Sequence, residues 1–154
     1  MKIAHSASIR VFCSEEENES EVLSGLKSLL PFDEEKEKIT IDRQTALGFA
    51  DRKILILEAT LVKDRHVKAF LENLMHKLPE QQKKLLLRQL ESRIDAEGNF
   101  FVKFEKETLA KHSELLVTDG GNCYHVRIKM AAYPGTKGNA VKAIRVLFEK
   151  NSGY

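Results

Sequence analysis

A row of basic side chains is the clearest chemical feature of this sequence. In the segment 123–130, Tyr, Val, Ile and Met residues alternate with His125, Arg127 and Lys129. Because side chains alternate between the two faces of a strand, the pattern predicts a strand that presents three cation-capable side chains together. From Arg127 to Lys150 there are six basic residues and one acidic residue, a local charge of +5. Such a segment is suited to binding phosphate groups by charge alone.

A second basic group, which includes Lys142 and Arg145, lies on the helix predicted over 137–150. The apolar stripe of this helix is formed by Ala140, Val141, Ile144, Leu147 and Phe148. If the two groups converge in space, their natural ligand is a nucleic-acid backbone. The alternative is that each group is simply the solvated face of its own element. The candidate RNA-binding residues are His125, Arg127, Lys129, Lys137, Lys142 and Arg145.

The segment 135–138, Gly-Thr-Lys-Gly, precedes this helix and admits three interpretations. It has the G-x-x-G pattern of the loop with which KH domains clamp a nucleic-acid backbone, although that loop normally joins two helices. It could also contact phosphate non-specifically through a helix N-terminus and Lys137. The third interpretation is a plain turn followed by a helix start. As a nucleotide-binding P-loop it has the wrong glycine spacing.

Catalytic and metal-binding patterns are absent from the sequence. The five histidines are scattered without the i, i+4 spacing of a helical metal site, and Cys13 and Cys123 are too few for a thiolate zinc site. No G-x-S-x-G motif is present. We therefore expect no enzyme activity, no metal, no cofactor, and two reduced, mostly buried cysteines.

Length and composition indicate one globular domain over residues 1–154. Hydrophobic residues make up 42% and charged residues 31%, which argues against disorder. No stretch approaches the roughly 18 uncharged apolar residues of a membrane span, so we expect a cytoplasmic protein without a membrane partner. The segment 15–37 carries a local charge of −7, which leaves +9 on the remainder of a chain whose total is +2.

Strands are predicted over 3–13, 38–43, 53–62 and 100–105, and a strand over 114–118 is expected to form a hairpin with 123–130. Helices are predicted from Ser14 to Pro31, over 64–78, and from Pro79 to Ile94. In the last of these, Leu85, Leu86 and Leu87 spread over about 200° of the circumference. One sheet face cannot cover so wide an arc. We therefore predict a second packing surface for these leucines, either the preceding helix or a partner chain, and a homodimer is one candidate assembly.

Several stretches along most of the chain resemble one archaeal protein family. They are SLLPF at 28–32, KAFLENLMHKL before Pro79, LLLRQLESRID at 85–95, NFFVKF at 99–104 and IKMAAYP at 128–134. The family is predicted to bind RNA and has been linked to the exosome. The resemblance implies an α/β (α+β) fold of two layers, like that of the ribosomal protein that binds 5S RNA, with helices packed on one face of a mostly antiparallel sheet.

The function implied by this resemblance is that of a non-catalytic RNA-binding accessory protein, with RNA and RNA-processing proteins as partners. The resemblance assigns no role to any individual residue. The alternative from a different class is a protein-interaction or dimerisation module, whose leucine-rich helix is the interface and whose charges only keep it soluble.

Overall fold

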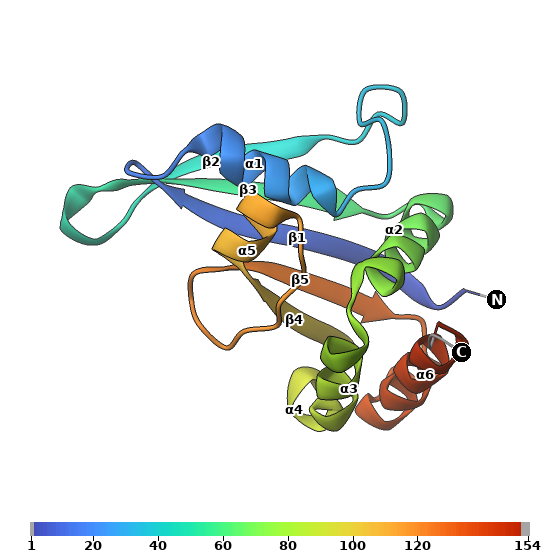
Figure 1. Ribbon diagram of the computed structural model, residues 1–154. Helices are drawn as coiled ribbons and strands as arrows, with labels where there is room; N and C mark the ends of the chain where they lie inside the picture. Colours follow the sequence, from blue (N-terminus) through green and yellow to red (C-terminus); the bar gives the residue numbers. More distant parts are fainter. Residues whose placement is uncertain (1, 152–154) are drawn as a thin grey trace.

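The protein is built around a five-stranded antiparallel sheet, with the strand order β2-β3-β1-β5-β4 (Figure 1). The computed structural model describes residues 2–151. The strands are β1 (Ala4–Ser14), β2 (Ile41–Leu47), β3 (Lys53–Leu61), β4 (Asn99–Glu105) and β5 (Cys123–Met130). The central strand is β1, which pairs with β3 on one side and β5 on the other. The most apolar strand of the sequence, β3, therefore lies beside the centre.

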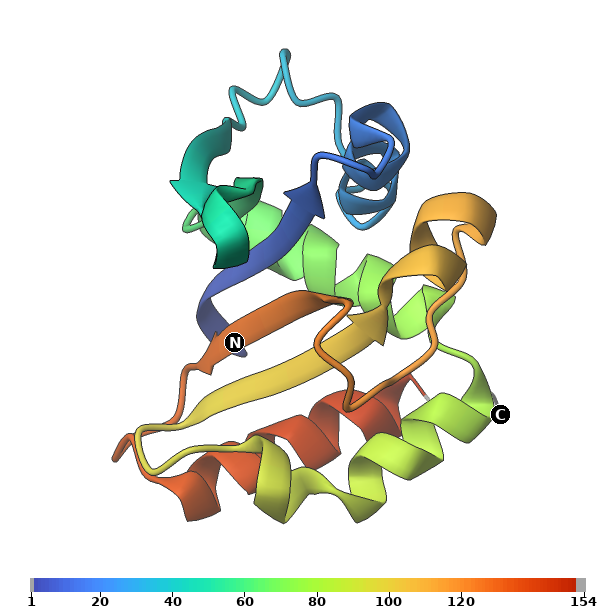
Figure 2. The same cartoon turned by 90° about the vertical axis from the view of Figure 1, so that its left-hand side faces the viewer.

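The helices cover one face of this sheet, as Figures 1 and 2 show. Inward-pointing residues of the strands, such as Ile9, Leu57 and Val126, are buried, whereas the alternate residues are largely accessible. The Phe148 ring of the C-terminal helix meets Phe100 of β4 on the buried side, with ring centroids 6.5 Å apart. The predicted two-layer α+β fold is thereby confirmed. Its helices are α1 (Glu19–Ser28), α2 (Asp64–Lys77), α3 (Glu80–Arg88), α4 (Leu90–Arg93), α5 (Lys106–His112) and α6 (Lys137–Lys150).

The leucine-rich helix is shorter than predicted. It breaks at Gln89 (φ −107°, ψ 10°), so the expected helix to Ile94 becomes α3 and the single turn α4. Leu86 is buried in the core, Leu87 packs against the core, and Leu85 is half-buried.

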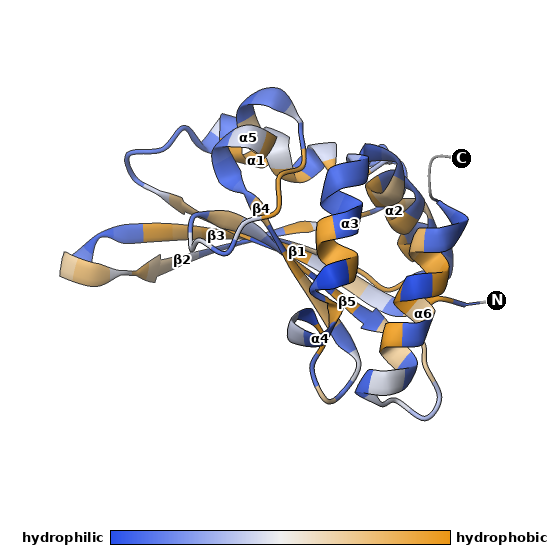
Figure 3. Cartoon of the chain, turned by 60° about the horizontal axis from the view of Figure 1, so that its bottom comes forward, coloured by the Kyte–Doolittle hydropathy of each residue, from blue (hydrophilic) through white to orange (hydrophobic). Residues whose placement is uncertain are grey.

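Two distant segments of the chain contact α3. The Lys83 ammonium of α3 donates to the Asn151 carbonyl just beyond α6 at 2.7 Å, and the Val117 amide donates to Gln82 Oε1 at 2.7 Å. Figure 3 shows α3 and α6 side by side, with apolar residues on both. The segment around Val117 contacts α3 through Gln82, and a partner-chain surface for Leu85, Leu86 and Leu87 stays a prediction.

The predicted hairpin between 114–118 and β5 is wrong. Instead, Val117 forms an isolated antiparallel bridge with Phe104 of β4, and the Glu105 amide donates to the Leu116 carbonyl at 2.8 Å. The reason is that both edges of β5 are already hydrogen-bonded, by β1 and by β4. The segment 114–118 therefore adds to the outer edge of β4, the only neighbour with a free edge in reach.

Tyr124 of β5 ties the sheet to α1. Its ring is fully buried and its hydroxyl donates to the Val22 carbonyl at 2.7 Å. Burial, together with the negative charge of Glu17, raises the pKa of this phenol. Gly25, one turn further along α1, leaves room for the hydroxyl: a Cβ there would overlap Tyr124 Oη and lie 3.0 Å from Ala110 Cα of α5.

Tyr124→Phe is expected to lower the free energy of unfolding by about 1 kcal/mol through the lost hydrogen bond. Gly25→Ala should cost about 1–3 kcal/mol by overpacking, and less when Tyr124 is already Phe, because the overlapping oxygen is gone. Urea unfolding of the two single variants and the double variant measures this coupling. Strictly additive costs would contradict the close approach of α1 to Tyr124.

Candidate nucleic-acid interface

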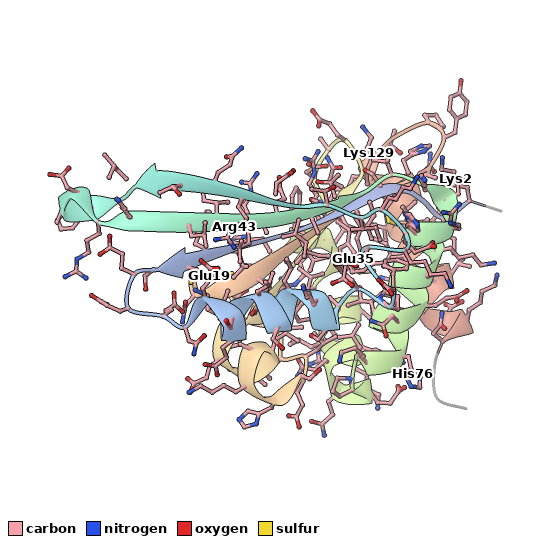
Figure 4. The ribbon with its side chains drawn as sticks, turned by 90° about the horizontal axis from the view of Figure 1, so that it is seen from above. Lys2, Glu19, Glu35, Arg43, His76 and Lys129 are labelled. Carbon is pink, nitrogen blue, oxygen red and sulfur yellow. The ribbon has the colours of Figure 1, made fainter. Side chains whose placement is uncertain are left out.

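The basic side chains predicted on β5 lie on the face of the sheet opposite the helices. In Figure 4, Lys129 projects on the side of the sheet that faces away from α1. Arg127 and Lys129 are exposed and His125 is half-buried, as the strand alternation predicts. No helix of residues 2–151 packs on this side. We call it the open face, and it consists of the outward-pointing side chains of β1 to β5.

The strand register arranges the open face in rows. One row runs from Phe101 on β4 through Arg127 on β5 and Ser8 on β1 to Thr60 on β3. The next row runs in the same order from Lys103 through His125 and Arg10 to Glu58. Lys129 lies one row beyond Arg127, opposite Asn99 and Ser6. Side chains from four strands are thus brought within reach of one ligand.

Charge divides the open face into two halves. On the β4 and β5 half, Lys103, Arg127 and Lys129 make no ion pair within 4 Å in the range 2–151, although the charge of Arg127, after hydrogen bonds from Asn99, helps to lower the pKa of Asp95. On the other half, Arg10 is paired with Glu58 at 2.9 Å, and Asp42 of β2 lies opposite Glu58. The first half can therefore attract a polyanion, and the second half repels one.

A hollow of about 230 Å³ opens on this face between β3, β1 and β5. Hydroxyl groups and charged groups line it together, so it can accept and donate hydrogen bonds to a polar ligand. The polar side chains that line it are Ser6, Ser8, Arg10, Glu58, Thr60 and Arg127.

Two aromatic rings on the open face were missed by the sequence analysis. Phe12 of β1 is 41% exposed and Phe101 of β4 is 39% exposed. Their signal was available: Phe12 continues the outward positions of Ser8 and Arg10, and Phe101 alternates with the inward Phe100 and Val102. Exposed apolar side chains that gather on one uncovered face of a sheet are consistent with a binding surface.

His125 sits between these two rings. Its imidazole centroid is 6.4 Å from that of Phe12, with the planes tilted by 52°. Burial lowers its pKa below the usual value of 6.5, and the cations Lys103 and Arg10 lower it further. The ring is therefore neutral at pH 7, and the positive charge of this face comes from lysine and arginine.

The other three predicted RNA-binding residues lie elsewhere. Lys137, Lys142 and Arg145 belong to α6, which packs on the helical side of the sheet. Lys142 and Arg145 are exposed there, and the Lys137 ammonium is 3.7 Å from a carboxylate oxygen of Glu91. The structure thus separates the six candidates into a sheet group and a helix group, which do not converge on one face.

The Gly135–Gly138 segment follows a strand and opens α6, so it lacks the preceding helix of a KH loop. The Thr136 hydroxyl accepts the Asn139 amide at 3.3 Å, which is an ordinary N-cap. This geometry is that of the turn and helix start.

The other features of the described residues are the two cysteines and a second hollow. Between residues 2 and 151, no three His, Cys, Asp or Glu side chains are grouped to hold a metal ion, and no helix is long and apolar enough to cross a membrane. Cys13 and Cys123 are buried free thiols, and burial raises the pKa of both. A second hollow of about 300 Å³ lies between α1 and α5. Its buried Lys106 is already engaged by Glu17 at 3.0 Å and by the Phe12 carbonyl at 2.6 Å.

Comparison with known proteins decides the family. A family model described as RNA binding matches residues 6–130. The chain belongs to this RNA-binding family. A protein of Pyrococcus abyssi that is named an RNA-binding protein is 32% identical over 146 residues, which cover 95% of this chain and 94% of the relative.

Solved structures of other archaeal proteins have a fold similar to that of this chain. A structure from Methanothermobacter thermautotrophicus is 25% identical with a TM-score of 0.77, and it covers 95% of this chain and 98% of its own. Another from Archaeoglobus fulgidus is 25% identical with a TM-score of 0.81, over 95% and 99% of the two chains. The match of the family model begins at Ser6 within β1, includes the other four strands and ends at Met130, before α6.

The electrostatics of the open face predict how His125 titrates. Its pKa should lie below 6.5 and should rise in Lys103→Ala, because a neighbouring cation is removed. Lys84→Ala, which removes an exposed cation from α3, should leave it unchanged. Since the folded state favours the neutral ring, the contribution of His125 to stability is complete above pH 6.5 and is lost as the pH falls through the folded pKa. Imidazole NMR titration measures the shift, and a pKa at or above 6.5 would contradict this environment.

Proposed function

We propose that this protein binds RNA on the open face of its sheet, as a non-catalytic accessory protein. The observation that carries the proposal is the group of cations without ion-pair partners, Lys103, Arg127 and Lys129, on the uncovered half of that face. Membership of the RNA-binding family and the RNA-binding name of the Pyrococcus abyssi relative support the ligand class.

The arrangement suits a ribose-phosphate backbone. Lysine and arginine side chains on neighbouring strands can neutralise successive phosphates and release their counterions. The hydroxyls of Ser6, Ser8 and Thr60 in the adjacent hollow can exchange hydrogen bonds with a 2′-hydroxyl, the group that distinguishes RNA from DNA. Glu58 and Asp42 repel phosphates from the far half of the sheet, so they set the limit of the site.

The sheet group is favoured over the helix group of candidates for two reasons. Arg127 and Lys129 lie within the region that the RNA-binding family model matches, whereas Lys137, Lys142 and Arg145 lie beyond it. The helix group also has no exposed aromatic ring beside it on α6, where Phe148 is buried.

This proposal predicts different outcomes for two matched pairs of substitutions. Arg127→Ala with Lys129→Ala should weaken RNA binding and reduce the slope of log K against log salt by roughly 1.4 to 1.8, the value for two lost phosphate contacts. Lys142→Ala with Arg145→Ala removes the same charge from α6 and should change both quantities much less. Fluorescence anisotropy at several salt concentrations measures both. Equal losses in the two pairs would place the interface elsewhere, and no binding by the unmodified protein at low salt would overturn the function.

The family resemblance extends the proposal to the cellular role. In this proposal the protein acts in the cytoplasm in RNA processing, in contact with the exosome, and its fold is related to that of the ribosomal protein that binds 5S RNA. Size-exclusion chromatography with a purified archaeal exosome tests the association. Co-elution is expected, and separate elution with or without RNA would contradict it.

Light scattering of the free protein tests the homodimer, since a monomer has a mass of 17.5 kDa.

A further inference from the structure

We propose that the RNA bound here is single-stranded, and that its bases stack on a diagonal track formed by the rings of Phe101, His125 and Phe12. The inference rests on the proposed function and deepens it, because it names the class of RNA and the part of the nucleotide that the protein contacts.

The register of the sheet places the three rings in line. His125 is one strand across from Phe101 and one row further along, and Phe12 is displaced from His125 by the same step in the same direction. Diagonal neighbours on one face of an antiparallel pair are about 7–8 Å apart. The ring centroids of His125 and Phe12 lie 6.4 Å apart, so these two rings are in reach of each other. By strand register, the track thus crosses β4, β5 and β1.

Phe12 and Phe101 each leave about two fifths of their surface exposed, on a face that no helix of the described chain covers. Their inward neighbours Val11, Phe100 and Val102 already fill the core. The backbone of β1 at Phe12 is also held by a hydrogen bond, because the buried Lys106 ammonium donates to the Phe12 carbonyl at 2.6 Å. These rings are therefore held ready on a rigid platform, which is the property that base stacking requires.

Cations accompany the track along its length. Arg10, on one side of His125 in its row, is paired with Glu58, so the available cations of the track are Lys103 on the other side of His125 and Arg127 beside Phe101 in the next row. Bases stacked on the rings would bring their phosphates to these side chains. His125 supplies a neutral ring at pH 7, so it contributes a stacking surface and not a phosphate contact.

This arrangement excludes a duplex as the preferred ligand. In an A-form helix the bases are stacked on each other and only their edges are accessible in the grooves, so their planes cannot reach a flat sheet surface. Unpaired bases can be splayed out onto aromatic rings, and such stacking tolerates any base sequence. The surface is therefore matched to single-stranded RNA of little sequence preference.

The test compares ring removal with charge removal. A labelled single-stranded oligouridine and a blunt RNA duplex are titrated with the full chain and with Phe12→Leu and Phe101→Leu, which keep an apolar side chain and limit any loss of folding. Each substitution should weaken oligouridine binding roughly 5- to 100-fold while leaving the salt slope unchanged, because no phosphate contact is lost. Phe101→Tyr should retain binding. Phe49→Leu, which alters a ring that is 95% exposed at the tip of the β2–β3 hairpin, is the matched control and should have no effect.

A base analogue reports the stacking directly. The fluorescence of 2-aminopurine placed within the oligonucleotide should be quenched on binding to the unmodified protein, and less so with Phe101→Leu. If the protein binds RNA but prefers the duplex, or binds equally well without the rings, the stacking track is wrong and the proposed function stands. If the unmodified protein binds neither RNA at low salt, the proposed function itself fails.

Discussion

Ile9 of β1 lies opposite Ala59 of β3 and Val126 of β5, and all three are buried. This double register at the central strand decides which side chains face the helices and which face solvent. A slip of one residue would turn Arg10 and Phe12 into the core and expose Ile9 and Val11, so the hydrophobic effect holds the register firmly. The open face, with its cations and rings, exists as a consequence of that constraint.

Charged residues from α5 and from the segment after β1 meet at one end of β1. Lys106 is buried, and its ammonium bonds both the Glu17 carboxylate and the Phe12 carbonyl. Although burial raises the pKa of Glu17, hydrogen bonds from Ser14 and Lys106 hold it below its usual value. The acidic segment after β1 therefore has a structural use: it neutralises a buried lysine that fixes the strand carrying Phe12. Elsewhere the same segment forms surface ion pairs, such as that of Glu19 with Arg43 (Figure 4).

Local patterns predicted most elements but not their partners. Period-two alternation located β1, β4 and β5, and helical periodicity located α2 and α6, because burial of one face imposes these periods on the sequence. The hairpin predicted for 114–118 failed since strand pairing depends on which edges remain free, and this is settled by segments far apart in the chain. Leu86 is buried in the core and Leu87 packs against it, and this packing depends on elements far from them in the sequence, which no local pattern encodes.

The sequence by itself determined a basic, alternating strand at His125, Arg127 and Lys129, because alternation is a property of one strand. Only the tertiary structure decided that these residues share a face with Lys103, Phe12 and Phe101 and not with Lys142 and Arg145. The physical reason is that a side chain's neighbours on a sheet come from other strands, through a register fixed by burial across the whole core. The tertiary structure thereby moved the candidate site from a stretch of sequence, residues 125 to 145, to a surface drawn from β1, β4 and β5.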